Sequence, residues 1–187
     1  MIFNKHSNLE GQHAFLGASN YHWLNYDFDK LEEVYRNEQA KAYGTEIHDL
    51  ASRLIYYGKK LEDNKSTLSL FVNDAITYKM DSEVVLYYSE NCFGTADAIS
   101  FRRNLLRIHD LKTGTTKASE NQLKIYAALF CLEYKYKPKD IKIELRIYQN
   151  DTVRIYEPAP EDIYGIMKKI IAFDKRIKKI QTEELEP

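Results

Sequence analysis

The chain has 187 residues, of which 44% are hydrophobic and 13% aromatic, and its formal net charge is −1. This composition predicts a folded globular protein with one full hydrophobic core, and it excludes a disordered chain. Nucleic-acid-binding domains are usually basic, so the near-zero charge counts against a uniformly basic nucleic-acid binder, although a local groove stays compatible with it.

The two cysteines, Cys92 and Cys131, form no C-x-x-C pair, which argues against a zinc ribbon or a disulfide scaffold. No apolar run approaches the length of a membrane span, and the first residues lack the apolar core of a signal peptide. We therefore expect a soluble, cytoplasmic protein with no membrane partner.

The first half of the chain has helical patterns. Residues 17–28 predict a short helix with Ser19 as its N-cap. Apolar residues recur at helical spacing over about 30–57, where Gly44 and Thr45 leave two alternatives, namely two helices or one helix with a close backbone contact. A further helix is expected within 67–80.

The second half predicts strands and helices in alternation. Segments 83–90, 93–101 and 105–112 are β-branched and aromatic with short connections, which is typical of an antiparallel meander. A helix is expected over 119–136 with Ser119 as its cap, two strands within 141–158, and a final helix opened by Pro160. This order predicts an α/β fold in a single domain over 1–187, with a mixed β-sheet flanked by helices.

Two carboxylates stand in these strand segments. Asp110 and Lys112 are two residues apart and so face the same side, at the end of the apolar face of Leu106 and Ile108. A carboxylate there is costly unless it is paired, hydrogen-bonded or bound to a cation. If the preceding strand is a neighbour, Asp97 can lie close to Asp110, and a divalent metal resolves the repulsion between them.

This set of residues suits metal-assisted hydrolysis of a phosphodiester. A hard cation between two acids can hold a phosphate oxygen and lower the pKa of a water, while an ammonium group orients that water or offsets developing charge. The alternative is structural: Asp110 and Lys112 form a strand-end ion pair, and Asp97 sits in a turn. The spacing alone supports both interpretations about equally.

Four motifs resemble the PD-(D/E)xK nuclease superfamily, in particular its RecB-type and phage exonuclease branch. "GTEIH" supplies Gly44, Thr45 and His48, and "GTAD" supplies Gly94 and Asp97. "DLKTG" begins at Asp110, and "QLKIY" supplies Gln122 and Tyr126. They occur in the order that the family requires, each on the expected kind of element. The resemblance implies a restriction-endonuclease-like fold.

The resemblance also implies roles for these residues. His48, Asp97, Asp110 and the backbone carbonyl of Leu111 would bind Mg²⁺ or Mn²⁺, and the imidazole would favour manganese. Asp97, Asp110 and Lys112 would form the catalytic set, with Lys112 positioning or activating the water. Gln122 and Tyr126, four residues apart on one helix face, would contact DNA or support Lys112, although they also fit the polar flank of an amphipathic helix.

Some members of the superfamily that these motifs resemble hold an iron–sulfur cluster with four cysteines. This chain has two cysteines, so no iron–sulfur cluster is expected.

Basic residues outside the motifs have two interpretations. Six of them on the final helix are either a solvated face or part of a DNA groove, and Arg102, Arg103 and Lys117 are further candidate phosphate contacts near the site.

The sequence therefore predicts a metal-dependent deoxyribonuclease, more an exonuclease than an endonuclease. It would act on single- or double-stranded DNA ends in recombination or repair, in a bacterial or phage-infected cell. A separate recombination or helicase protein is the expected partner, and a homo-oligomer is compatible with the sequence. The alternative is a catalytically inactive nuclease-fold protein that serves as a DNA-binding or protein-interaction module.

Overall fold

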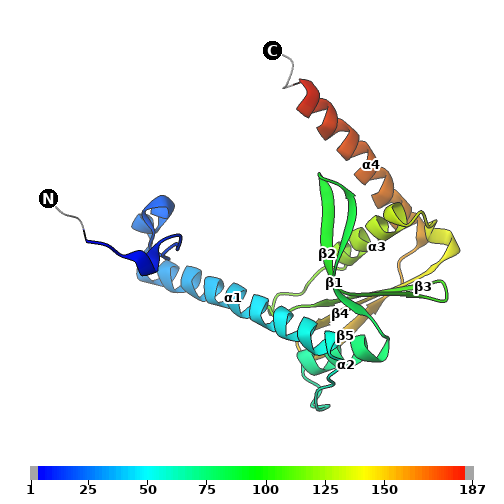
Figure 1. Cartoon of the computed structure of the whole chain (residues 1–187), viewed down its shortest axis with the longest axis horizontal. Coiled ribbons are helices and arrows are strands. Elements are labelled where there is room, and N and C mark those ends of the chain that lie inside the picture. Colours follow the sequence, from blue (N-terminus) through cyan, green and yellow to red (C-terminus); the bar gives the residue numbers. More distant parts are fainter. Residues whose placement is uncertain (1–3, 184–187) are drawn as a thin grey trace. The chain divides into compact units, whose positions relative to one another are not determined.

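The computed structural model describes residues 4–183 and divides the chain into two compact units. The first unit is Met1–Tyr43 and the second is Gly44–Pro187, and the boundary falls inside helix α1 (Phe28–Tyr56). The second unit contains a β-sheet with helices packed on it (Figure 1). Within residues 4–183, no helix combines the length and the apolar character that crossing a membrane requires.

The first unit consists of the 3₁₀ helices η1 (Ser7–Leu9) and η2 (Ala18–Asn25), followed by the first part of α1. The Trp23 indole N–H donates a hydrogen bond to the carbonyl of Gly17 at 3.1 Å. The prediction that Ser19 caps this helix is wrong, because the helix begins at Ala18 and Gly17 occupies the cap position without a side-chain hydrogen bond.

The sheet of the second unit has five strands in the order of the chain. They are β1 (Asp81–Ser89), β2 (Cys92–Arg102), β3 (Leu105–Leu111), β4 (Lys142–Gln149) and β5 (Thr152–Tyr156). The first three form the expected antiparallel meander, β3 and β4 are parallel, and β4 and β5 are antiparallel. The structure thus confirms an α/β fold with a mixed sheet flanked by helices.

The helices begin and end close to the predicted positions. They are α1, which is continuous through Gly44, then α2 (Thr67–Thr77), α3 (Asn121–Glu133) and α4 (Pro160–Glu183), with a 3₁₀ turn η3 (Pro138–Asp140) before β4. The Ser66 hydroxyl accepts the N–H of Ser69 and so caps α2. The prediction that Ser119 is the N-cap of α3 is wrong: Glu120 holds that position, although the Ser119 hydroxyl accepts the N–H of Asn121 at 3.2 Å.

Alternating residues of β3 divide the core between the two faces of the sheet. Leu106 and Ile108 are buried in a cluster with residues of α3 and α4, including Leu123 and Ile163. Leu111 lies on the other face, in a cluster with residues of α1 and α2. The candidate motifs therefore stand where helices from both faces reach one end of the central strand.

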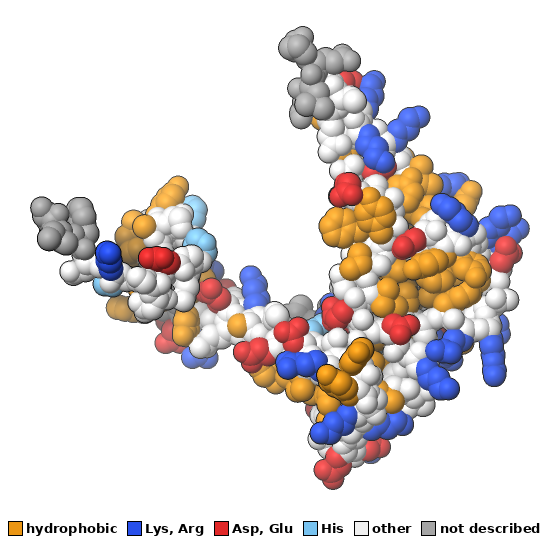
Figure 2. All heavy atoms as spheres, viewed as in Figure 1, with side chains coloured by type: hydrophobic (Ala, Val, Ile, Leu, Met, Phe, Trp, Pro, Cys, Tyr) orange, Lys and Arg blue, Asp and Glu red, His pale blue; other side chains and the backbone are white. Residues whose placement is uncertain are grey.

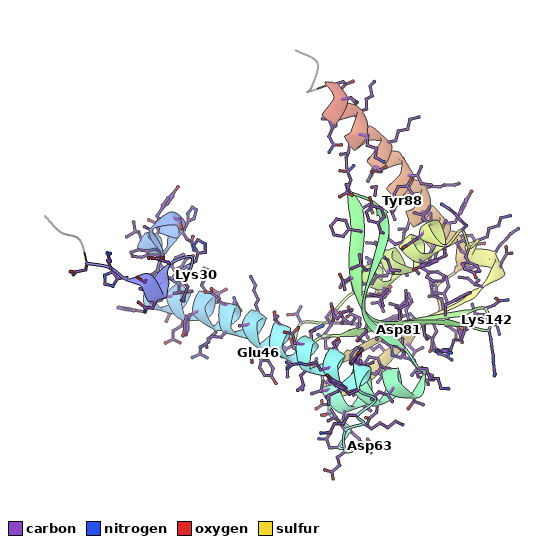
Figure 3. The ribbon with its side chains drawn as sticks, viewed as in Figure 1. Lys30, Glu46, Asp63, Asp81, Tyr88 and Lys142 are labelled. Carbon is purple, nitrogen blue, oxygen red and sulfur yellow. The ribbon has the colours of Figure 1, made fainter. Side chains whose placement is uncertain are left out.

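A buried carboxylate of helix α4 forms hydrogen bonds with the β1–β2 hairpin. Asp174 accepts hydrogen bonds from the Ser89 hydroxyl at 2.6 Å and the Asn91 amide at 3.0 Å, and the Lys178 ammonium lies 2.8 Å from it. Lys178 first, and then Ser89 and Asn91, lower the pKa of Asp174 to about 2. Tyr88, labelled on this hairpin in Figure 3, packs against the core.

Candidate active site

Three carboxylates occupy neighbouring positions across β1, β2 and β3. The pairing of Ala98 with His109 brings the preceding residue of β2, Asp97, beside the following residue of β3, Asp110. On the other side of β2, Ser82 pairs with Ala98 and Val84 with Ala96, so Glu83 stands opposite Asp97. The meander thus lines up Glu83, Asp97 and Asp110 in one row, called the carboxylate row below.

Asp110 is the buried member of the row. Its side chain is 2% exposed, and the Lys112 ammonium lies 3.0 Å from its Oδ1 in an ion pair. Neither carboxylate oxygen accepts a hydrogen bond of good geometry, and in residues 4–183 the only other buried side-chain polar atom in this condition is His109 Nε2. Burial, and next the charge of Asp97, raise the pKa of Asp110 to about 6.

Asp97 joins α1 to the end of β3. Its Oδ1 lies 3.4 Å from His48 Nδ1, and its Oδ2 accepts the backbone N–H of Leu111 at 2.8 Å. The hydrogen bond with Asp97 outweighs burial and raises the pKa of His48. The structure therefore brings His48 and the Leu111 N–H together on Asp97. The predicted role of the Leu111 carbonyl as a metal ligand stays a prediction.

Gly44 explains how His48 reaches this position. A Cβ atom on Gly44 would lie 3.0 Å from the Thr113 hydroxyl, so the absence of a side chain lets α1 pass close to the chain just beyond β3. His48 lies one helical turn further along α1 and consequently faces the same end of the sheet. The continuous helix with a close backbone contact is thus the correct one of the two alternatives for this segment.

Glu83 is a site residue that the sequence patterns did not indicate. Ligand atoms of His48, Glu83 and Asp97 all lie within 4.8 Å of one another, a grouping that could hold a metal ion. Glu83 has a φ of +52°, a left-handed conformation that non-glycine residues seldom adopt within a strand. Partial desolvation and then the charge of Asp97 raise the pKa of Glu83.

The group of three differs from the predicted ligand set, which remains a prediction. His48 and Asp97 group with Glu83, whereas Asp110 is not a member of that group of three. The two oxygens of Asp97 are directed to different partners, His48 and the Leu111 N–H. Asp110 lies on the other side of Asp97, close enough for the charge of Asp97 to raise its pKa.

A polar chain continues from Lys112 onto α3. The Lys112 ammonium donates to Gln122 Oε1 at 2.9 Å, and Gln122 Nε2 donates to the Tyr126 hydroxyl at 2.9 Å. Gly94 makes room for this chain, because a Cβ on Gly94 would lie 2.9 Å from Cε1 of the Tyr126 ring. Tyr126 also packs against the core. Its role toward DNA or Lys112 stays a prediction.

Two further sets of residues lie away from the carboxylate row. His109 lies on the opposite face from Asp110, where its ring contacts Tyr148 in a buried network. Arg102 and Arg103 are not near the site, and that prediction is wrong: they stand at the β2–β3 turn, at the opposite end of β3 from Asp110.

The sequence and the fold of this chain were compared with those of known proteins. No family model, curated protein or solved structure matches it. The chemistry of the site therefore has to follow from its own residues.

The donor set fits a hard divalent cation. Two carboxylates and an imidazole converge beside a third carboxylate, which is buried and accepts no hydrogen bond. Oxygen-rich sets of this kind suit Mg²⁺ or Mn²⁺, and the imidazole is more compatible with Mn²⁺. Zinc sites, by contrast, usually combine thiolate or several imidazole ligands.

Proposed function

We propose that this chain is a metal-dependent deoxyribonuclease that hydrolyses phosphodiester bonds. The observation that carries the proposal is Asp110, a buried carboxylate whose two oxygens accept no hydrogen bond, standing between a second carboxylate and a lysine. A fold tolerates such a group when a cation or a reacting ligand completes its surroundings. The four motifs that resemble PD-(D/E)xK nucleases, and a restriction-endonuclease-like fold, belong to the same proposal.

In this proposal Asp97 and Asp110 hold Mg²⁺ or Mn²⁺, with the Leu111 carbonyl, His48 and Glu83 as further ligands. The bound cation supplies Lewis acidity: it lowers the pKa of water and offsets negative charge on the phosphate. Asp97 can bridge the two parts of the row because each of its oxygens already faces a different partner. Glu83 adds the negative charge that a divalent ion requires.

Lys112 is the proposed catalytic cation. Its ammonium is held from two sides, by Asp110 at 3.0 Å and by Gln122 at 2.9 Å, which fixes it at the edge of the carboxylate row. From that position it can donate a hydrogen bond to the attacking water or to a phosphate oxygen. Gln122 and Tyr126 act through Lys112 and are therefore positioning residues.

We further propose that the enzyme is an exonuclease acting in DNA recombination or repair, because the motif order resembles the RecB-type and phage exonuclease branch. The competing function is a binding module that kept the fold without catalysis. The nuclease and the binding module differ in one property: only the nuclease uses the carboxylate row and Lys112 to cleave DNA.

The test is a cleavage assay on end-labelled linear, nicked and covalently closed circular DNA, with Mg²⁺ or Mn²⁺. The wild type should shorten linear and nicked DNA and leave closed circles intact. Asp110→Asn, which removes the buried charge with little change of shape, should slow cleavage by at least about a hundredfold. Wild-type protein that binds DNA and Mn²⁺ but cuts none of the three substrates would establish the binding module instead.

A further inference from the structure

A basic cleft lies at the other end of the sheet from the candidate active site. Its volume is about 920 Å³, and it is formed by the end of α2, the β2–β3 turn, η3 and the start of β4. Six of its lining residues are cationic: Lys79, Arg102, Arg103, Arg107, Lys139 and Lys142. Figure 2 shows Lys and Arg side chains gathered at this end of the sheet, where Figure 3 labels Lys142.

The positive charge of the cleft is largely uncompensated. Asp140 is the one acidic residue among its lining. Arg107 is paired with Glu144 at 3.0 Å, whereas none of the other five cations forms an ion pair with any residue in the described range 4–183. The chain as a whole carries a net charge of −1, so the net charge does not reveal the positive charge concentrated in this cleft.

Turn geometry and hydrogen bonds order the backbone that carries Arg102, Arg103 and Lys142. Arg103 and Asn104 have φ angles of +51° and +58°, which gives the two-residue turn that suits a β-hairpin. Asparagine or glycine is the usual residue at both positions, so an arginine in this left-handed conformation strains the backbone. The Lys142 N–H donates to the Asn104 carbonyl at 2.8 Å, and the Arg102 guanidinium donates to the Lys79 carbonyl at 3.3 Å.

An aromatic ring gives further rigidity to one wall. The guanidinium of Arg107 lies 4.4 Å from the centre of the Tyr78 ring, and that of Arg146 lies 4.8 Å from it. Such cation–π contacts, together with the Glu144 pair, keep Arg107 in place. This wall of the cleft is therefore ordered before an anion binds.

We propose that this cleft binds the phosphate backbone of a nucleic acid, as a second contact for the DNA that the active site cuts. A single phosphate ion would neutralise only part of the charge of five unpaired cations, whereas a phosphodiester chain presents several charges in a row. Arginine forks also match phosphate oxygens in pairs. Asp110 lies five residue steps along β3 from Leu105 at the cleft, a span of about 17 Å or roughly five base pairs.

This inference rests on the proposed nuclease function for the identity of the substrate, but its test needs no cleavage. A fluorescein-labelled duplex of about two helical turns is titrated with the full chain in EDTA, over a series of KCl concentrations, and anisotropy is measured. The cleft variant is Arg102→Gln/Arg103→Asn/Lys142→Gln, in which asparagine suits the positive φ of the turn. The control, Arg53→Gln/Lys59→Gln/Lys65→Asn, removes the same charge from exposed positions at the end of α1 and in the loop after it, with asparagine again at a positive φ.

The cleft variant should bind the duplex at least about tenfold more weakly. The slope of log affinity against log salt should fall by about 0.9 for each DNA phosphate that the variant no longer neutralises. The control should change affinity by less than about threefold. Equal weakening in both variants would show general attraction and overturn the proposal. Tighter binding of a polyglutamate peptide than of the duplex would overturn it in favour of an acidic protein partner.

Two measurements keep the outcomes separate. Thermal melting of each variant shows whether it is folded, and if the triple variant is not, Arg102→Gln and Lys142→Gln are tested singly for the same direction of change. Wild-type protein that binds DNA through the cleft but never cuts it would contradict the nuclease function and still support the cleft as a DNA-binding site. A cleft variant that binds duplex like the wild type would contradict the cleft alone.

Discussion

Asp110 raises the free energy of the folded protein whenever it is charged. Its pKa of about 6, against 3.8 for an ordinary aspartate, corresponds to a penalty of about 3 kcal/mol on the charged form. The Lys112 ion pair lowers this penalty but does not remove it. A valine or leucine would avoid this penalty, and in the proposed function the bound cation offsets it.

Lys112 gives the sharpest single-residue prediction. Lys112→Ala should keep the fold and bind Mn²⁺ within a few-fold of the wild type, because the cation ligands remain. Cleavage should fall by about a hundred- to ten-thousandfold, the range typical for loss of a group that assists proton transfer. The measurement is single-turnover cleavage of end-labelled linear DNA, with Lys59→Ala, in an exposed loop, as the control. Normal turnover by Lys112→Ala would contradict the catalytic role proposed for Lys112.

At the residue scale the sequence predicted the buried acids and their neighbours but not Glu83. At the β1–β2 turn, Ser89 pairs with Cys92. If the same register continued along both strands, Val84 would stand opposite Asp97. The strand has an irregularity between Tyr87 and Ser89 that shifts the register by one residue, so Glu83 takes the place instead. A bulge of this kind has no distinct sequence signal, and the third carboxylate was missed for that reason.

At the scale of elements, two glycines decide how helices approach the sheet. Gly44 lets α1 pass the Thr113 hydroxyl, and Gly94 lets the Tyr126 ring of α3 lie against β2. The sequence showed both glycines as parts of motifs. It could not show which side chains they make room for, because those contacts join segments far apart in the chain.

Gly94→Ala tests this packing. The added Cβ would stand 2.9 Å from the Tyr126 ring, so the ring must move, and we expect a loss of about 1–3 kcal/mol in the free energy of unfolding. Gly165→Ala is the matched control, since nothing lies within 4 Å of its Cβ, and alanine in a helix should add about 0.5–1 kcal/mol. Urea denaturation measures both. Equal stability of the two variants would refute the close contact.

At the scale of the whole molecule, charge is divided between the two ends of one sheet. The carboxylate row lies at the end of β3 that contains Asp110, and the basic cleft lies at the end that contains Leu105. The order of strands, and hence the meander, was predictable from the sequence, but composition alone conceals this separation because the charges nearly cancel. Arg102 and Arg103 stand at the turn between two antiparallel strands, at the opposite end of β3 from Asp110.

Calorimetric titration with Mn²⁺ tests most directly whether the carboxylate row is a cation site. The wild type and Asp63→Asn, which changes an exposed acid in the loop after α1 (Figure 3), should bind Mn²⁺ alike. Asp97→Asn, which changes the residue shared by both parts of the row, should weaken binding by about a hundredfold or more, and Glu83→Gln by about tenfold. The same affinity in all four proteins, or no binding to the wild type, would show that the row is not a cation site.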